Sequence, residues 1–498
     1  MSEIKQRAAK GFAWTLGSQF ALQLVQTGTT IFLARLLVPR DFGLIGMAAI
    51  VTGFVSVINQ FGLNSAVVQS KKLDRSHLDS TFWASNFIGL FVFLIVVLIA
   101  PRASNYFHEP AIKAILIVIS LNFIFDSLTS VHQAVFTRRL QFKKLALITF
   151  LSTIATGVVS VVMAFKGYGV WSFVGGALAA SVVQIIVYPI MWPWFPRLRF
   201  NYQKFKDIFH FGTMYTGNAI MNYVNSNLDY FFIGRILGST SLGLYSLAYR
   251  LIMFPQRKVG AAINRVAFPA YSRVQDDNAR LTRGYLSAVG YINFITFPFL
   301  IGLAIVAPEF VKVVYGAKWE PAIIPLQLLC FAGIMIQIAA NTGSVLFAKG
   351  RIDLPFKLSI IRAIVLVTAL FFFAKFGIIY VALIVDAVFF IYNLTILIIV
   401  QRLLASSLQA YWKRVRPIFL GSAIMALGVI SIGHIFSNFS DAALLFTMFG
   451  VGITIYFGFF WLTNKNFVID IWKVVKLILP KKNIWLMIKE KFSRTSAE

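Results

Sequence analysis

The stretch Phe32–Ala48 reads Phe-Leu-Ala-Arg-Leu-Leu-Val-Pro-Arg-Asp-Phe-Gly-Leu-Ile-Gly-Met-Ala, and a related stretch, Phe232–Ala248, follows about 200 positions later. Each copy holds the end of an apolar helix, a short polar turn with Arg and Gly, and the start of a second apolar helix. The coinciding residues are Arg35 with Arg235, Leu37 with Leu237, Gly43 with Gly243, Leu44 with Leu244, and Ala48 with Ala248. This similarity predicts two structurally equivalent halves.

Two further similarities follow in the same order along the chain. The sequence Glu-Pro-Ala-Ile at Glu109–Ile112 returns at Glu320–Ile323, and Gly169 matches Gly377 at the head of an apolar run. Three matches in the same order along the chain indicate a duplicated unit of about 200 residues.

Composition indicates the solvent in which the chain folds. Its 498 residues are 58% hydrophobic and 13% charged, and the mean hydropathy is +0.78. A soluble domain has no means of hiding so much apolar surface, so we expect an all-α polytopic membrane protein. The net charge of +28 reflects the Lys and Arg residues that orient membrane loops, and we expect no nucleic-acid partner. The single cysteine, Cys330, lies in an apolar run, so no disulfide framework is expected.

Apolar runs predict about 14 transmembrane helices. Their expected ranges are about 11–37, 42–68, 81–100 (stopped by Pro101), 111–136, 145–165, 168–191, 208–237, 242–269, 285–307, 322–348, 358–374, 378–400, 418–436 and 442–462. The last two have no counterpart in the repeat. The predicted domains are an N-terminal six-helix lobe at 1–192, a cytoplasmic linker at 193–207, a C-terminal six-helix lobe at 208–401, an extra helix pair at 402–463 and a cationic amphipathic cytoplasmic tail at 464–498.

The distribution of basic residues predicts the orientation. With a cytoplasmic N-terminus, about 37 of the 46 Lys and Arg residues fall on the cytoplasmic side. Both termini are therefore expected in the cytoplasm. Six helices in each repeat is an even number, so the two halves should be parallel repeats related by an axis along the membrane normal.

The chain lacks the residue patterns of catalysis. It has no nucleotide-binding glycine loop, no metal-ligand spacing and no Ser/His/Asp grouping among its five His residues. We expect no enzyme activity, no catalytic residue, no metal site and no cofactor.

Polar stripes on apolar helices are the candidate binding features. Spacings of four and three place each set on one narrow helix face. The sets are Gln19, Gln23, Gln26 and Thr30 on the first helix; Asn218, Asn222, Asn225 and Asp229 on the seventh; Asn122, Asp126, Thr129 and Gln133 on the fourth; and Gln337, Asn341 and Ser344 on the tenth. Hydrogen bonds between helices are the alternative explanation. For the first and seventh helices we favour a water-filled cavity.

Charged residues at membrane depth are a sharper signal, because burying them is costly. The acidic candidates, assigned to coupling, are Asp126, Asp229 and Asp386. The basic candidates are Arg250 and, nearer the inner face, Arg257, Arg265 and Arg362. Arg35 and Arg235 lie at outer helix ends, where contact with lipid headgroups is the alternative to a binding role.

Several stretches together resemble the bacterial polysaccharide transporter family. They are Asp229–Gly238, Gly243–Arg250, Leu33–Gly43, Phe61–Gln69 and Ala267–Gln275. The similarity covers essentially the whole chain, and its motifs are specific to the family and not to a substrate. The family belongs to a superfamily that also holds multidrug efflux proteins and a peptidoglycan lipid flippase.

The resemblance implies two six-helix lobes that rock around a central cavity lined by helices 1, 2, 7 and 8. It implies a flippase in the bacterial inner membrane, which moves polyprenyl-pyrophosphate-linked oligosaccharides from the cytoplasmic to the periplasmic leaflet. The glycan would enter exopolysaccharide, capsule or lipopolysaccharide, and partners would be membrane lipids, a polymerase and assembly proteins. On this interpretation the amides suit sugar hydroxyls, and Arg250, Arg257, Arg35 and Arg235 suit pyrophosphate.

Two alternatives stay open at this stage. A cation-coupled multidrug or small-solute antiporter of the same fold would be expected to carry more acidic than basic charge in its cavity, whereas here Arg dominates. A scaffold without transport activity in a polysaccharide assembly complex is the third interpretation.

Overall fold

The computed structural model describes residues 21–59, 74–198, 221, 223–436, 438–465 and 467–469, and within them all regular structure is helical. The predicted starts of helices 1 and 7, the predicted end of helix 2, residues 199–207 of the linker and residues 470–498 of the tail lie outside this description.

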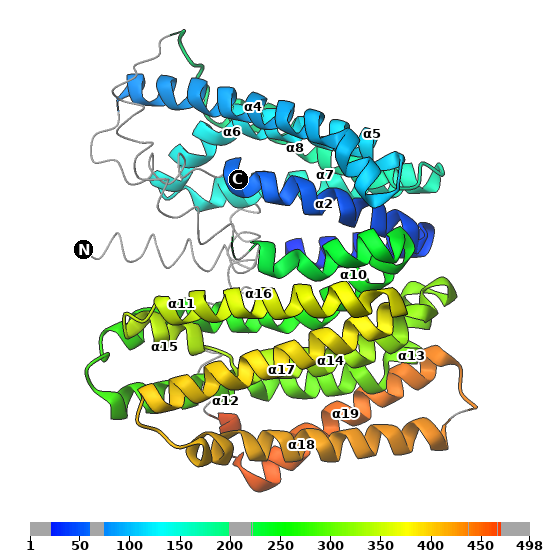
Figure 1. Ribbon diagram of the computed structural model, residues 1–498, viewed down its shortest axis with the longest axis vertical. Helices are drawn as coiled ribbons and strands as arrows, with labels where there is room; N and C mark the ends of the chain where they lie inside the picture. The colour runs from blue at the N-terminus through cyan, green and yellow to red at the C-terminus, as the bar shows by residue number, and fades with distance from the viewer. Residues whose placement is uncertain are drawn as a thin grey trace, which may run out of the picture.

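The first half forms one bundle of helices (Figure 1). Its elements are a helical segment at 21–36, α2 (Pro39–Asn59), α4 (Arg75–Phe107), α5 (Ala111–Ile119), α6 (Leu121–Arg138), α7 (Phe142–Phe165) and α8 (Trp171–Met191).

The second half forms another bundle, followed by the extra pair. Its elements are a helical segment at 223–236, α10 (Gly238–Pro255), the π-helix η1 (Gln256–Gly260), α11 (Ala261–Ser272), α12 (Asn278–Ile305), α13 (Ala307–Phe310), η2 (Val311–Tyr315), η3 (Ala317–Ala322), α14 (Ile323–Ile338), α15 (Thr342–Ala348), α16 (Asp353–Phe373), η4 (Ala374–Phe376) and α17 (Ile378–Leu403). The pair consists of α18 (Leu408–Ile435) and α19 (Asp441–Thr463).

The two bundles are stacked along the longest axis of the molecule, with their helices running side by side (Figure 1). Helices α2 and α10 pack against each other where the bundles meet. At the far end of the second bundle, α18 packs against α12 and α19. This architecture confirms the predicted all-α fold class, while the predicted number of 14 helices is not tested by the described residues.

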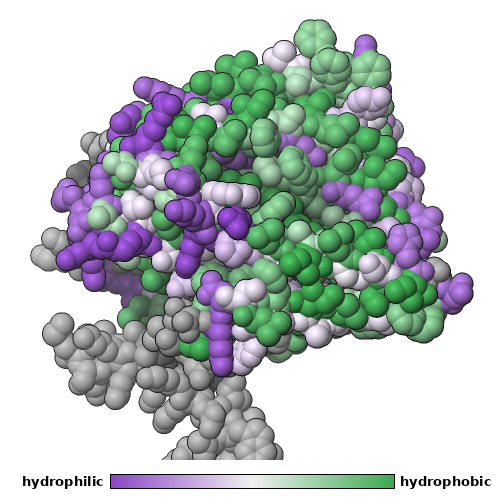
Figure 2. Space-filling view, turned by 90° about the horizontal axis from the view of Figure 1, so that it is seen from below, coloured by the Kyte–Doolittle hydropathy of each residue, from purple (hydrophilic) through white to green (hydrophobic). Residues whose placement is uncertain are grey.

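The surface is apolar in the middle and polar at the ends. Ten helical stretches of the described residues are long and apolar enough to cross a membrane. Large side chains such as Phe87, Phe371 and Phe446 are more than two-thirds exposed. Figure 2 shows a broad hydrophobic band, with hydrophilic residues gathered at the end that lies on the left in both views. Only lipid makes such exposure favourable, so the chain is a multi-pass membrane protein.

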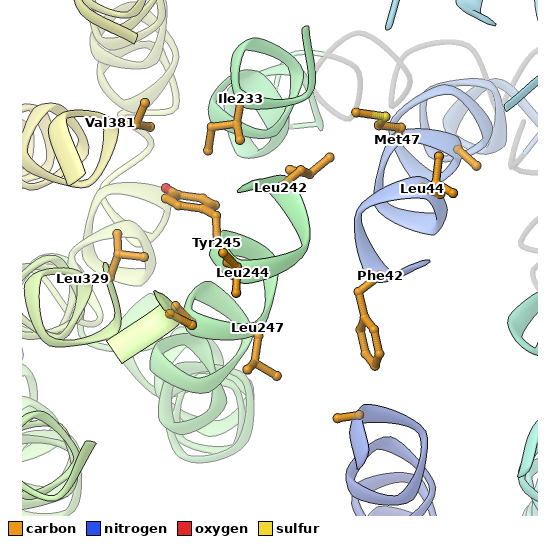
Figure 3. Close-up of a cluster of buried hydrophobic side chains, with 14 of the residues drawn as sticks. Phe42, Leu44, Met47, Ile233, Leu242, Leu244, Tyr245, Leu247, Leu329 and Val381 are labelled. Carbon is orange, nitrogen blue, oxygen red and sulfur yellow. The ribbon is translucent and has the colours of Figure 1, made fainter. Parts of the chain in front are cut away.

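The core between the bundles is built from both copies of the duplicated stretch. Met47 of α2 and Leu242 of α10 are fully buried and face each other (Figure 3). Phe42 lies edge-on to Trp319 of η3, with ring centroids 5.0 Å apart. The junction of the halves is therefore a packed apolar contact, which holds the polar groups around it in place.

Pro101 does not end the third helix, contrary to the expectation from sequence. Helix α4 continues through it to Phe107 and ends at His108, which adopts a left-handed conformation with φ 55°. Proline removes one backbone hydrogen bond, and neighbouring bonds and helices keep a membrane helix intact around it.

Three predicted continuous helices are divided in the structure. The fourth is divided into α5 and α6 at Ser120, and the tenth into α14 and α15 at residues 339–341. Asn341 has φ 69°, so it leaves the helix, and the predicted Gln337–Asn341–Ser344 stripe does not lie on one uninterrupted helix. The eighth contains the π-helix η1, which includes Arg257. Hydropathy does not detect such breaks because they leave composition unchanged.

Candidate functional site

The duplicated stretches meet each other at one end of the bundles. A β-carbon added at Gly43 would come closer than 3.0 Å to the carbonyl oxygen of Ser239, and one added at Gly243 would do the same to the carbonyl oxygen of Pro39. These two contacts are equivalent under the 200-residue repeat. Only glycine permits so close a backbone approach, and we call this contact, with the residues that bridge it, the repeat junction.

Arg35 crosses the repeat junction from the first half to the second. Its Nε donates to the Val314 carbonyl oxygen at 3.0 Å, and Nη2 donates to the carbonyl oxygen of Val313. In the opposite direction, Trp319 Nε1 donates to the Ala34 carbonyl oxygen at 2.8 Å. The carbonyl groups at the end of η2 thus accept hydrogen bonds from the guanidinium group, which carries several donors in one plane.

Arg235, the repeat partner of Arg35, crosses from the second half to the first. Its Nη1 contacts Nε2 of His108, and its guanidinium carbon lies 5.1 Å from the ring centroid of Tyr106. The two equivalent arginines therefore each reach a helix end of the opposite half, η2 for Arg35 and the end of α4 for Arg235. Each of them joins the halves and does not line a described cavity.

Glu109 completes the repeat junction. Its Oε2 accepts a hydrogen bond from Arg40 Nη2 at 2.9 Å, and its Oε1 accepts one from the Ser239 hydroxyl. The carboxylate raises the pKa of the Arg40 guanidinium, first through this hydrogen bond and then through its charge. Both carboxylate oxygens are thus engaged, one by each half of the molecule.

A second polar region surrounds Asp229 inside the second half. Asp229 is 5% exposed and accepts hydrogen bonds from the Tyr245 hydroxyl at 2.7 Å and from the Tyr230 backbone N–H at 2.9 Å. It borders a cavity of about 10 Å³, roughly the space of one water molecule. Asn225 and Tyr249 line the same cavity, together with apolar residues of α16 and α17.

Three arginines lie around this region. Arg250 and Arg257 are exposed, and the charges of both act on the Tyr230 hydroxyl. Among the described residues, no carboxylate forms an ion pair with either of them. Arg362 lies 4.6 Å above the Tyr392 ring, and its charge acts on Asp229. The structure thus brings cationic groups to the tyrosines beside Asp229.

The predicted amides are only partly described. Gln23 donates to the Thr27 hydroxyl at 3.0 Å, and the backbone carbonyl of Gln26 accepts from Thr30 at 2.9 Å. Asn225 is 6% exposed and donates to the Met221 carbonyl oxygen at 3.0 Å. The remaining candidates, Gln19, Asn218 and Asn222, lie outside the described residues.

The three candidate acidic residues are not brought together. Asp126 lies between α6 and α8, where the Ser181 hydroxyl donates to it at 3.4 Å. Asp386 of α17 accepts from the Ala332 backbone N–H of α14 at 3.0 Å. Asp229 alone borders the described cavity. Within the described ranges, no three His, Cys, Asp or Glu side chains are placed to hold a metal ion.

Several residues of these regions were not among the candidates from sequence. They are His108, Glu109, Trp319, Tyr230, Tyr245 and Tyr249. Glu109, Tyr230, Tyr245 and Tyr249 belong to the repeated stretches or to the stretches that resemble the family, which was the available signal. His108 and Trp319 directly precede the two Glu-Pro-Ala-Ile copies, and no pattern distinguished them.

Comparison with known proteins identifies the family of the chain. A family model described as polysaccharide biosynthesis protein matches residues 32–324, which include both copies of the duplicated stretch. The chain belongs to this family.

The names of curated relatives also refer to polysaccharide biosynthesis. The lipopolysaccharide biosynthesis protein WzxC of Escherichia coli is 27% identical, over 74% of this chain and 75% of its own length. The teichuronic acid biosynthesis protein TuaB of Bacillus subtilis is 26% identical, over 87% of this chain and 90% of its own length. These similarities confirm the predicted family.

Among solved structures, the lipid II flippase MurJ in an inward closed conformation aligns with a TM-score of 0.71. The alignment covers 91% of this chain and 99% of that chain, at 15% identity. At this identity the likeness establishes the fold, which is the two-lobed fold that the resemblance implied.

Proposed function

We propose that this polysaccharide biosynthesis protein is a flippase. Its cargo would be an oligosaccharide repeat unit linked to polyprenyl pyrophosphate, moved from the cytoplasmic to the periplasmic leaflet of the bacterial inner membrane. The names of WzxC and TuaB support the glycan, and the name of the fold relative MurJ supports the lipid carrier.

The observation that carries the proposal is the pair Arg250 and Arg257. Both are exposed, their charges act on the Tyr230 hydroxyl, and neither has a carboxylate partner among the described residues. An exposed, unpaired guanidinium at membrane depth is costly unless it meets an anion. Pyrophosphate is such an anion, and guanidinium binds its oxygens with two parallel hydrogen bonds.

The repeat junction supports an alternating-access mechanism. It joins the halves through side-chain hydrogen bonds, a close glycine contact and the apolar packing of α2 on α10, all of which are non-covalent. On the proposed orientation, with both termini in the cytoplasm, this end faces the periplasm. The junction would then close the periplasmic side while the cargo binds, and separation of its residues would release the cargo.

Within this proposal the buried Asp229 is the coupling residue. It lies beside the one-water cavity and the tyrosines that Arg250 and Arg257 influence. A change of its protonation or ion occupancy would therefore act directly on the anion site. Asp126 and Asp386 keep the same proposed role at a distance from that cavity. Polymerase and assembly proteins remain proposed partners.

The test is flipping in proteoliposomes that contain a fluorescent polyprenyl-pyrophosphate-linked oligosaccharide and an impermeant quencher outside. We expect Arg250→Lys to slow flipping at least about tenfold, because hydrogen bonds to charged groups contribute about 1.5–3 kcal/mol. Arg265→Lys of α11, also exposed, is the matched control and should flip normally.

Three outcomes of this assay would contradict the proposal, each in a different way. Normal flipping by Arg250→Lys would remove Arg250 from the anion site. Export of a cationic dye without any glycan flipping would favour the antiporter. Absence of both activities in well-folded protein would favour a scaffold.

A further inference from the structure

Helix α12 contains a backbone acceptor that its own helix does not satisfy. Pro298 lies inside α12 and has no N–H, so it donates no hydrogen bond to the carbonyl oxygen of Phe294, four residues earlier. The hydroxyl of Tyr456, in α19, donates to this oxygen at 2.8 Å, in a buried position. A helix of the extra pair therefore supplies the donor that the proline lacks.

The interruption between α14 and α15 is completed in the same way. The chain leaves the helix at residues 339–341, and the N–H of Thr342 donates to the carbonyl oxygen one residue beyond that of Ile338. The Ile338 carbonyl oxygen instead accepts a hydrogen bond from the Tyr411 hydroxyl of α18 at 2.7 Å. We call Tyr411 and Tyr456 the capping tyrosines, because each satisfies a carbonyl group at a helix interruption of the second half.

The two helices that carry the capping tyrosines are closely packed on each other. A β-carbon added at Gly421 of α18 would come closer than 3.0 Å to the Phe459 ring, and one added at Gly428 would do the same to the Ile455 side chain. Small residues at such positions allow two membrane helices to approach closely. Because α18 also packs along α12, both hydroxyl groups are presented to the second half by one packed unit.

The first half provides an internal comparison. Helix α4 also contains a proline near its end, Pro101, so the carbonyl oxygen of Val97 likewise loses its donor within the helix. Among the described residues, no side chain donates a hydrogen bond to that oxygen. The extra pair packs on helices of the second half, so it makes unequal two halves that the duplication had made equivalent.

Unpaired polar side chains lie next to the interruption. A β-carbon at Gly333 of α14 would lie 3.1 Å from Leu300 of α12, and these two helices run in opposite directions. About one helical turn further along both helices come Gln337 and Thr296, which are fully buried. Their polar groups and the amide of Asn341 have no hydrogen-bond partner among the described residues. Such groups are unfavourable in a core, which favours a second arrangement that pairs them.

We propose that Tyr411 and Tyr456 are positioning residues of the transport cycle. They hold the two interruptions in the state of the structure, and their release lets α12 and α14 bend where a proline and a non-helical turn already weaken the helices. The amide of Gln337 would then supply a donor for the freed Ile338 carbonyl group. The inference rests on the proposed alternating access. The extra pair thereby favours the state in which the repeat junction is closed.

The experiment measures the ratio of the two states in purified full-length protein without substrate. Spin labels on Lys113→Cys of α5 and Lys312→Cys of η2, both exposed, report the separation of the halves at the repeat junction in a Cys330→Ala background. Tyr411→Phe and Tyr456→Phe each remove one hydroxyl and keep the ring. We expect each to raise the open-to-closed ratio at least about fivefold, because a buried carbonyl group loses its donor, and the double variant to raise it further.

Two further variants test the assignment of each hydroxyl. Tyr285 of α12 is the matched control: it is fully buried and its hydroxyl has no partner among the described residues, so Tyr285→Phe should leave the ratio unchanged. Pro298→Ala supplies an N–H for the Phe294 carbonyl oxygen. In that background Tyr456→Phe should lose most of its effect on the ratio, whereas Tyr411→Phe should keep its own.

An unchanged ratio in both tyrosine variants, with a lower melting temperature, would overturn the inference, because the hydroxyl groups would then stabilise both states equally. An equal effect of Tyr456→Phe with and without Pro298 would overturn it as well. If the double variant fails to fold, the two single variants decide. Failure of the proposed function is distinguishable, because a protein whose ratio shifts as expected yet flips no lipid-linked glycan contradicts the function and leaves the positioning role standing.

Discussion

The repeat junction predicts a specific response to the substitution Gly43→Ala. The new methyl group would overlap the Ser239 carbonyl oxygen, an atom of the backbone that cannot rotate away. Relieving the overlap requires α2 and α10 to separate by more than about 1 Å, and overpacking of this kind costs about 1–3 kcal/mol. The cost falls on the closed state alone, because the contact exists only when the halves meet.

A cost of about 1–3 kcal/mol to one of two states shifts their ratio by about 5–150-fold. The assay places a cysteine at Leu242, which is fully buried at the junction, in the Cys330→Ala background. An impermeant maleimide added from the periplasmic side reports the open fraction by its labelling rate. We expect Gly43→Ala to accelerate labelling at least about fivefold.

The same helix supplies the matched control. A β-carbon at Gly46 would lie 3.4 Å from Leu242 Cδ2, an ordinary contact with a flexible side chain. Because Leu242 carries the cysteine in the labelling assay, both glycine variants are also compared by the distance between spin labels on Lys113→Cys of α5 and Lys312→Cys of η2, two exposed positions, in the Cys330→Ala background. By repeat symmetry, Gly243→Ala should act like Gly43→Ala, and the double variant should be less than additive because both changes strain one contact. Equal closure of the Gly43→Ala and Gly46→Ala proteins, at normal abundance, would refute the reasoning.

Two further predictions follow from the proposed site and orientation. Asp229→Asn keeps the Tyr245 hydrogen bond but loses the negative charge, so we expect about a tenfold slower flipping, equivalent to about 1.4 kcal/mol, with an unchanged melting temperature; normal flipping would exclude Asp229 from coupling. Reporter fusions should indicate cytoplasm after Arg139 and periplasm near Asn105, in keeping with the basic loops, and a well-expressed fusion on the opposite side would invert the proposed orientation.

Some of the candidate site could be read from the chain because duplication marks equivalent positions. Arg35 with Arg235 and Gly43 with Gly243 were identified as pairs without any structure. Their partners were not, because the sequence carries no record of which helix faces meet. The carbonyl group of Val314 and the imidazole of His108 become partners only when two halves, far apart in the chain, are packed together.

Helix boundaries were likewise predicted in part from the sequence and decided in part by packing. Apolar length predicted where the chain crosses the membrane, since every backbone polar group there must be bonded within a helix. Local exceptions depended on packing: Pro101 lies inside α4, and Asn341 interrupts the helix that its polar spacing had suggested. Neither change alters the hydrophobic run, so hydropathy predicted the span and missed the break.

By itself, the sequence determined the membrane setting, the duplicated architecture and the family, because these depend on composition and on residues that recur at a constant offset. Tertiary structure alone decided that the two copies touch each other, that Arg35 and Arg235 bridge opposite halves, and that Asp229 borders a small cavity apart from Asp126 and Asp386. The physical reason is that burial in lipid acts on each helix separately, whereas close contacts and hydrogen bonds act between helices. Which helices meet is settled by side-chain packing across the whole molecule.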